Sequence, residues 1–136
     1  MRKGFTLLEI IMTIAIVIMI ATISINTVTK YAGKQNVHAQ ERIITADLKY
    51  ALELAQTTDR DIRIIFDTQK YTITDSDAIK KTLYLNPGFT VSAQVFGYTP
   101  QGTPMYSGTL YLSYKKIIQS KLTVALGSGL LKWQNL

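Results

Sequence analysis

Apolar residues follow one another almost without interruption from Phe5 to Ile25, and Glu9 is the only charged residue among them. As a helix this segment would span about 30 Å at roughly 1.5 Å per residue, which is the thickness of the hydrocarbon core of a bilayer. Because backbone polar groups in lipid must be satisfied within the segment, we expect a helix there despite its many β-branched residues. Arg2 and Lys3 precede the segment. Basic flanks tend to stay cytoplasmic, which predicts a single pass through the plasma (inner) membrane with the rest of the chain outside the cytoplasm.

The helical pattern continues beyond this segment, and the next proline along the chain is Pro87. Apolar residues recur there at helical spacing, which predicts an amphipathic continuation that ends near residues 56–59: Val37, Ile44, Leu48, Ala51, Leu52 and Ala55. Polar residues are expected on the other faces: Lys34, Gln40, Arg42, Asp47, Lys49 and Glu53. The apolar stripe must therefore pack against another element.

From residue 59 onward the pattern changes to short alternating segments separated by turn residues. It predicts a hairpin of strands 62–66 and 71–74, then strands at 82–85, 89–96 and 109–114, and a final hairpin of 122–126 with 130–133. Residues 97–108 are rich in glycine and proline and are expected to form a loop. One long helix followed only by strands predicts an α+β fold, with the helix packed on an antiparallel β-sheet.

Composition is that of an ordinary folded protein, with 47% hydrophobic and 18% charged residues and a net charge of +6. No acidic residue follows Asp77, and the same stretch carries six lysines: Lys80, Lys81, Lys115, Lys116, Lys121 and Lys132. Two interpretations remain open, a solubilising surface and an anion-binding face. The absence of cysteine excludes disulfides, thiolate metal sites and a cysteine nucleophile.

We predict no catalytic site, no metal site and no cofactor, and therefore a protein that is not an enzyme. His38 is the only histidine and is expected to be a solvated residue of the long helix. Ser128 lies between two glycines and has no base nearby in the sequence. The acid pairs Asp59/Asp61 and Asp75/Asp77 fall where turns are expected and lack the spacing of a calcium-binding loop.

Three explanations compete for the N-terminal segment. A cleaved secretory signal needs a small-x-small site after the apolar run, and residues 21–23 and 24–26 fit that poorly. A plain signal anchor explains the length and the basic start but not Glu9, since a carboxylate in an apolar span costs about 2–3.5 kcal/mol on insertion scales. The third explanation gives this carboxylate a partner.

The residues Gly4-Phe5-Thr6-Leu7-Leu8-Glu9, after a basic start, resemble the class III signal of type IV prepilins and type II secretion pseudopilins. The resemblance implies that a prepilin peptidase cleaves after Gly4 and methylates the new amine of Phe5. It also implies that Glu9 pairs with the N-terminal amine of a neighbouring subunit during assembly. A carboxylate that faces an ammonium is compensated where a lone buried one is not. Many major pilins have a proline at the position that Asn26 occupies here. The absence of this proline from the present sequence favours a pseudopilin or minor subunit.

The order of the long helix, the first hairpin, residues 96–102, residues 108–112 and the closing segment 122–129 is similar to the GspH/FimT family of minor pseudopilins and minor pilins. Residues 126–129 are also similar to the same turn in Gram-positive competence pseudopilins. The resemblance implies a pilin-like fold divided into a leader (1–4), a transmembrane and filament-core helix (5–25), an extracytoplasmic continuation (26–58) and a GspH/FimT-like β domain (59–136). The expected partners are the peptidase, other pilin subunits and membrane lipid before assembly.

Two functions remain open at this point. The first is a filament subunit that helps initiate a type IV pilus or a type II secretion-like pseudopilus for protein secretion or DNA uptake. The second is a filament subunit that acts as a DNA receptor in competence, with Lys115, Lys116 and Lys121 as candidate contacts to phosphate. No arginine follows Arg63, so bidentate phosphate recognition is absent from this half of the chain.

Overall fold

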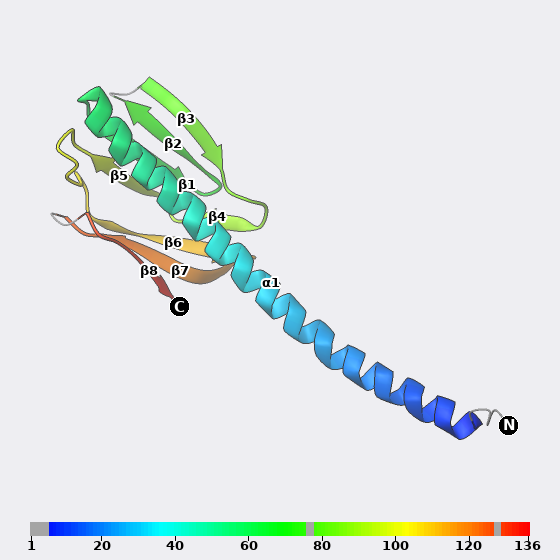
Figure 1. Cartoon of the computed structure of the whole chain (residues 1–136). Helices are drawn as coiled ribbons and strands as arrows, with labels where there is room; N and C mark the ends of the chain where they lie inside the picture. Colours follow the sequence, from blue (N-terminus) through cyan, green and yellow to red (C-terminus); the bar gives the residue numbers. More distant parts are fainter. Residues whose placement is uncertain (1–5, 76–77, 127–128) are drawn as a thin grey trace. The chain divides into compact units, whose positions relative to one another are not determined.

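The computed structural model describes residues 6–75, 78–126 and 129–136, without the side chains of residues 23–32. One helix is followed by eight strands in this part of the chain (Figure 1): α1 (Leu7–Thr58), β1 (Ile62–Asp67), β2 (Lys70–Asp75), β3 (Ala78–Tyr84), β4 (Phe89–Val91), β5 (Gln94–Tyr98), β6 (Gly108–Tyr114), β7 (Ile117–Val124) and β8 (Leu131–Asn135). The chain divides into two compact units, Met1–Asn36 and Val37–Leu136, which are called the N-terminal unit and the C-terminal unit below.

Both ends of α1 follow from local side-chain and backbone chemistry. Thr6 precedes the first helical residue, and its Oγ1 accepts a hydrogen bond from the Glu9 amide at 3.4 Å, as a helix cap does. The helix ends at Thr58 because Asp59 takes a left-handed φ of 53°, one that aspartate tolerates better than most residues. The Arg60 amide then donates to the Ala55 carbonyl at 3.3 Å. The predicted helix end near residues 56–59 is therefore confirmed.

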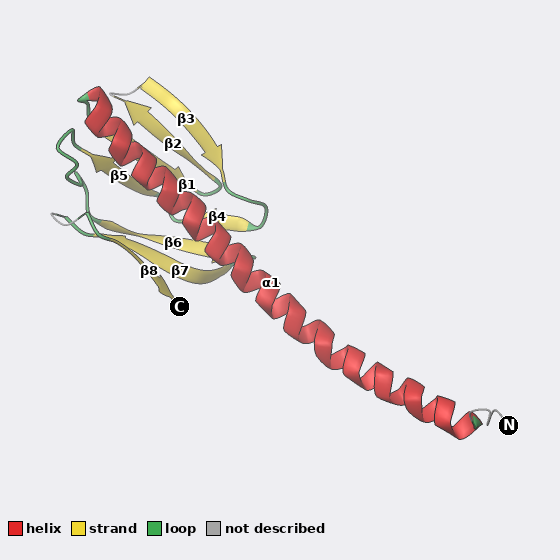
Figure 2. Cartoon of the chain, in the orientation of Figure 1, coloured by secondary structure: helices red, strands yellow, loops and turns green. Residues whose placement is uncertain are grey.

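The eight described strands form two four-stranded sheets, ordered β3-β2-β1-β5 and β4-β6-β7-β8 (Figure 2). Every strand pair within them is antiparallel. The predicted α+β class with a helix on antiparallel strands is confirmed, and the single expected sheet is resolved into two. The hairpins β1–β2 and β7–β8 correspond to those predicted from the alternating pattern. Gly127 and Ser128, in the last turn, lie outside the described residues.

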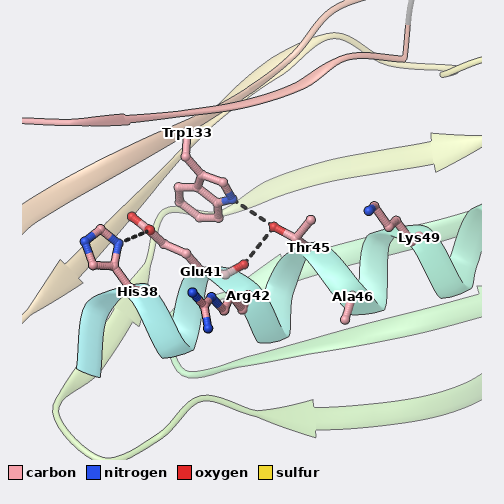
Figure 3. A pocket seen from close by; sticks show the side chains of 7 residues that line it. All are labelled: His38, Glu41, Arg42, Thr45, Ala46, Lys49 and Trp133. Carbon is pink, nitrogen blue, oxygen red and sulfur yellow. Dashed lines mark hydrogen bonds and ion pairs between the residues drawn. The ribbon is translucent and has the colours of Figure 1, made fainter. Parts of the chain in front are cut away.

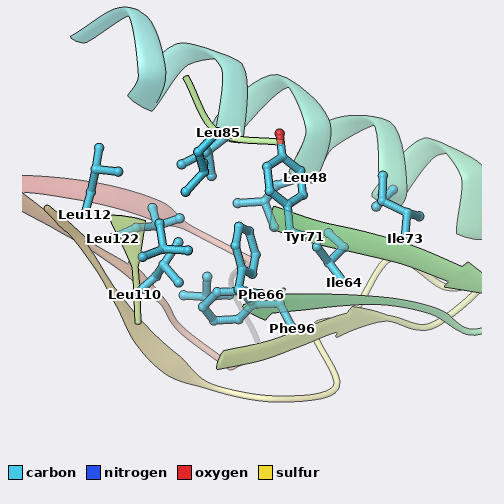
Figure 4. Close-up of a cluster of buried hydrophobic side chains, with 14 of the residues drawn as sticks. Leu48, Ile64, Phe66, Tyr71, Ile73, Leu85, Phe96, Leu110, Leu112 and Leu122 are labelled. Atoms are coloured by element: carbon cyan, nitrogen blue, oxygen red, sulfur yellow. The ribbon is translucent and has the colours of Figure 1, made fainter. Parts of the chain in front are cut away.

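The core of the C-terminal unit is built from the α1 stripe and the inward faces of both sheets (Figure 4). Four members of the predicted stripe are fully buried: Ile44, Leu48, Ala51 and Ala55. They pack with alternate strand residues such as Ile64 and Tyr71 of the first sheet and Leu110, Leu112 and Leu122 of the second. The alternation of buried and exposed positions in β1 and β6 matches the period of two that the sequence showed.

Three strand predictions were wrong in their extent. The strand expected at residues 82–85 is β3, which begins at Ala78 and ends at Tyr84. Residues 89–96 do not form one strand, because the chain leaves the second sheet after Val91 and joins the first sheet at Gln94. Ser92 holds this crossing: its amide donates to the Tyr111 carbonyl, and its Oγ accepts from the Tyr111 amide at 3.0 Å. The last hairpin also begins earlier than predicted, since β7 starts at Ile117. Lys115 and Lys116 form the turn before it with φ values of 51° and 68°, which the sequence pattern did not indicate.

Two residues expected on polar faces of the helix are buried or partly buried instead. Gln40 is 1% exposed, and its Oε1 accepts a hydrogen bond from the Asn86 amide at 3.2 Å. Asp47 accepts a hydrogen bond from the Tyr71 hydroxyl and lies 3.8 Å from the Lys81 Nζ. Burial is tolerated at both positions because each polar group has a partner.

Candidate functional site

The N-terminal unit presents an apolar helix with its side chains exposed. The large apolar residues from Leu7 to Ile20 are between 46% and 76% exposed. The hydroxyls in this segment are satisfied within the helix: Thr13 Oγ1 donates to the Glu9 and Ile10 carbonyls, and Thr22 Oγ1 donates to the Met19 carbonyl at 2.8 Å. An apolar surface of this extent marks a region that binds lipid or protein.

The side chain of Glu9, unlike those of Thr13 and Thr22, is not hydrogen-bonded to any described backbone atom of the helix. Its amide is part of the cap, with the Thr6 carbonyl oxygen at 3.0 Å and Thr6 Oγ1 at 3.4 Å. Its carboxylate is exposed and has no hydrogen-bond or ion-pair partner within the described part of the chain. As the third helical residue it also lies where a negative charge interacts favourably with the helix dipole. The carboxylate therefore lies at the start of an exposed apolar surface.

The other two residues predicted from the signal, Gly4 and Phe5, lie outside the described residues. Among the residues that are described, no helix is long and apolar enough to cross a membrane.

A groove of about 390 Å³ lies on the C-terminal unit, between α1 and β8 (Figure 3). Its lining combines cationic, acidic and aromatic side chains: His38, Glu41, Arg42, Thr45, Ala46, Lys49 and Trp133. The Trp133 Nε1–H donates to Thr45 Oγ1 at 2.9 Å, and the Thr45 hydroxyl donates to the Glu41 carbonyl at 2.7 Å. These bonds fix β8 against the helix.

Glu41 is the least expected member of this groove, since it is only 7% exposed. Its Oε2 lies 2.9 Å from His38 Nδ1, whereas its Oε1 is buried without a partner among the described atoms. The Thr45 hydroxyl is already engaged in two hydrogen bonds and is not a free nucleophile. Among the described residues, no group of three or more His, Cys, Asp or Glu side chains could hold a metal ion. The hydrogen bonds from Trp133 to Thr45 and from Thr45 to the Glu41 carbonyl form a polar contact between α1 and β8 in this groove.

The three lysines predicted to contact DNA do not form one cluster. Lys115 and Lys116 share the turn between β6 and β7, whereas Lys121 lies within β7, paired with Tyr111 on one side and Gln134 on the other. The Lys115 Nζ lies 5.4 Å from the centroid of the Tyr114 ring. DNA contact by these residues stays a prediction.

Two features of the groove between α1 and β8 were not predicted from the sequence. Glu41 lies four residues after Val37 and three before Ile44, so its position on the apolar stripe could have indicated burial. The partnership of Trp133 with Thr45 joins residues 88 positions apart and had no local signal. His38 was expected to be solvated. Its side chain is 53% exposed and contacts Glu41.

No protein-family model matches the sequence, and no curated protein shows significant similarity to it. Solved structures do match. The type IV minor pilin FimU of Pseudomonas aeruginosa superposes with a TM-score of 0.60 and 14% identity, over 76% of this chain and 92% of that chain. The minor pseudopilin EpsH from the type 2 secretion system of Vibrio cholerae also gives 0.60 and 14%, over 74% of this chain and 96% of that chain. At such identities the similarity establishes the fold, and this chain has the fold of minor pilins and minor pseudopilins.

Proposed function

We propose that this chain is a minor pilin- or pseudopilin-type subunit that is processed at its N-terminus, anchored in the membrane and assembled into a filament. The observation that carries the proposal is the Glu9 carboxylate, which lacks a partner among the described residues at the start of an exposed apolar helix. The pilin fold shared with FimU and EpsH supports it. Their similarity to this chain is in architecture, so the function rests on the N-terminal segment.

Residues 5–25 serve as the membrane anchor before assembly and as the filament core afterwards in this proposal. A prepilin peptidase removes residues 1–4 and methylates Phe5, and residues 26–136 lie outside the cytoplasm. Lipid first covers the exposed apolar side chains of this helix, and the helices of neighbouring subunits then replace it. The chain has no catalytic role of its own in this scheme.

Glu9 sets the axial position of the subunit in the filament. Its carboxylate pairs with the N-terminal ammonium of a neighbouring Phe5, and only one offset between two helices satisfies that pair. Burial of either charge alone is unfavourable, so the pairing favours assembled subunits over misplaced ones. The subunit then takes part in filament initiation, for protein secretion or for DNA uptake.

The helix cap provides a competing explanation of Glu9, and two substitutions separate the two roles. Glu9→Gln removes the charge and keeps a residue that is favourable three positions after a capping threonine. Thr6→Val removes the Thr6 Oγ1 acceptor and keeps the charge. Each variant is expressed beside the other subunits of its filament, and sheared filaments and membranes are compared by immunoblot. Intact mass of the filament subunit reports cleavage after Gly4 and methylation at Phe5.

We expect Glu9→Gln to remain in membranes and to be depleted from filaments, and Thr6→Val to enter filaments nearly as well as the unchanged chain. Wild-type levels of Glu9→Gln in filaments would show that the charge has no role in assembly. A filament subunit that begins at Met1, or at Ser24 or beyond, would contradict the proposed processing.

A further inference from the structure

The turn between β6 and β7 carries two lysines in a backbone conformation that does not suit them. Tyr114 pairs with Ile117, so Lys115 and Lys116 are the two central residues of a tight hairpin turn. Their φ values of 51° and 68° are the left-handed pair that this turn requires. Asn-Gly and Asp-Gly are the favoured sequences there, because other side chains crowd the backbone at positive φ. Two lysines at these positions therefore carry a conformational cost that turn formation alone does not explain.

The two residues after the turn are isoleucines with exposed side chains. Ile117 is 65% exposed and Ile118 is 49% exposed, although both belong to a strand. We call residues 115–118 the hairpin tip. It places two cations directly beside two large apolar side chains.

The hairpin tip is held firmly by the strands below it. The Lys115 amide donates to the Gly88 carbonyl at 2.9 Å, and the Tyr114 ring packs on the Phe89 ring with their centroids 4.7 Å apart. Gly88 has a φ of 86°, and a Cβ there would lie 3.1 Å from the Tyr114 ring. The exposed lysines and isoleucines thus project from a packed base.

Contacts within the C-terminal unit place the hairpin tip at the end where that unit begins. The unit starts at Val37, and one turn later Gln40 Oε1 accepts a hydrogen bond from the Asn86 amide. Asn86 lies two residues before Gly88, which is bonded to Lys115. In Figure 1 the β3–β4 and β6–β7 connections accordingly lie at the same end of the strands. We call this the basal end of the C-terminal unit.

We propose that the hairpin tip binds the surface of an anionic membrane, with Lys115 and Lys116 on lipid phosphates and Ile117 and Ile118 inserted at the level of the headgroups. This inference rests on the proposed function, in which residues 5–25 anchor the chain in the bilayer. The residues between Ile25 and Val37 span about 18 Å as a helix. The headgroup layer occupies about 5–8 Å on each side of the hydrocarbon. In the proposed anchor, the start of the C-terminal unit is therefore tethered within about 18 Å of the hydrocarbon.

The chemistry of the hairpin tip favours lipid over DNA. A membrane surface has charged headgroups on the outside and apolar acyl chains beneath them. Lysines beside aliphatic side chains match both layers, as in other interfacial membrane contacts. Contacts with unpaired bases use aromatic or arginine side chains, and the exposed pair here is aliphatic. Tyr114, which directly precedes the hairpin tip, packs on the Phe89 ring and lies beside the Lys115 ammonium.

A label at the hairpin tip of the full chain tests the proposal. The sequence contains no cysteine, so one introduced cysteine takes an environment-sensitive fluorophore at a single position. Ile117→Cys reports on the hairpin tip, and Ile14→Cys reports on the proposed anchor. Gln101→Cys is the control, because Gly102 beside it packs against Gln56 in the last turns of α1, away from the basal end. Each labelled chain is reconstituted in neutral phosphatidylcholine vesicles and in vesicles with one-third phosphatidylglycerol.

We expect the Ile117 label to move into an apolar environment in the anionic vesicles and to stay in water in the neutral ones. The Gln101 label should stay in water in both, and the Ile14 label should be in lipid in both. Each lysine near an anionic surface contributes about fivefold to association, so loss of both should weaken the contact of the hairpin tip by roughly 25-fold. High salt should weaken it too.

The decisive variant is Lys115→Asn/Lys116→Gly, because it installs the favoured sequence for this turn. It should fold at least as stably as the unchanged chain, so loss of the lipid signal cannot be attributed to unfolding. Lys115→Arg/Lys116→Arg should keep the signal. An unchanged Ile117 signal in the Asn-Gly variant would overturn the proposal.

The remaining outcomes separate this inference from the proposed function. An Ile117 label in water beside an Ile14 label in lipid overturns the hairpin contact and leaves the anchor standing. An Ile14 label in water beside an Ile117 label in lipid overturns the anchor and leaves the contact standing. An Ile117 label that becomes buried only in assembled filaments identifies a subunit interface and overturns the inference. The inference is also overturned if the Asn-Gly variant loses binding to short duplex DNA in a gel shift while the lipid signal of the Ile117 label is unchanged.

Discussion

Leu48→Ala is the sharpest test of how the second half of α1 is used. Leu48 is 0% exposed and belongs to the cluster that joins α1 to both sheets. Comparable truncations of buried leucine cost about 2.7–5 kcal/mol, because transfer energy is lost and a cavity remains. Folded domains are stable by about 5–15 kcal/mol in total. We therefore expect this one substitution to remove a large fraction of the stability of the C-terminal unit, about 3–4 kcal/mol.

Leu52 supplies the matched control on the same helix, one turn later. It is only partly buried against the same cluster, so Leu52→Ala should cost roughly half as much. Leu48→Asp should abolish folding, since it adds a buried charge without a partner. Urea denaturation of the fragment Val37–Leu136, followed by circular dichroism, measures all three. If Leu48→Ala cost less than Leu52→Ala, or less than about 1 kcal/mol, the stripe would not be the core element described above.

Three further predictions concern the C-terminal unit. The fragment Val37–Leu136 should be soluble and show mixed helix and strand by circular dichroism, because it is a compact unit with its own core; an unfolded spectrum would contradict this. Burial and the hydrogen bond to Asp47 raise the pKa of Tyr71 far above its usual range, and burial raises the pKa of Tyr98. Because both pKa values are raised, the unfolded phenols ionise before the folded ones, so this stability is complete below about pH 10 and is lost as the pH rises above it, by up to about 1.4 kcal/mol per pH unit for Tyr71; Tyr71→Phe should flatten this slope in urea titrations. Any binding of the unit to DNA should be weak, independent of sequence and sensitive to salt, with Lys121→Ala reducing it less than Lys115→Ala/Lys116→Ala, because Lys121 lies apart from the turn; gel shifts at two salt concentrations measure this.

The elements of the fold could be predicted where one periodicity persists over many residues. The stripe from Val37 to Ala55 gave the helix, its buried face and its end, because tertiary packing and local spacing agree there. The strand predictions that failed are those in which a local irregularity of the backbone sets where the strand begins or ends. Ser92 carries the chain from one sheet to the other within an apparently continuous alternating run. The turn at Lys115 and Lys116 has none of the residues that normally mark a hairpin.

Polar side chains in the core were harder to predict for a different reason. Gln40 and Asp47 look like surface residues of an amphipathic helix, and each becomes buried or partly buried by a partner far away in sequence, Asn86 or Tyr71. The groove at Glu41 and Trp133 likewise depends on how β8 is placed against α1. Such pairings belong to the tertiary arrangement, and a local pattern does not contain them.

The two explanations of Glu9, helix capping and assembly, differ in the free energies they involve. A carboxylate in the first turn of a helix gains about 0.3–1 kcal/mol from the dipole. A carboxylate in an apolar membrane span costs about 2–3.5 kcal/mol on insertion scales, with the upper values at the helix centre. The cap at Thr6 would therefore be a sufficient reason for Glu9 in a helix exposed to water, and an insufficient one in a helix covered by lipid. Glutamine keeps the capping ability without the charge, so a sequence selected only for helix formation in lipid would favour it. In the proposed anchor, the retained charge requires a positive partner, and the ammonium created by cleavage before Phe5 supplies one at the same depth of a neighbouring helix.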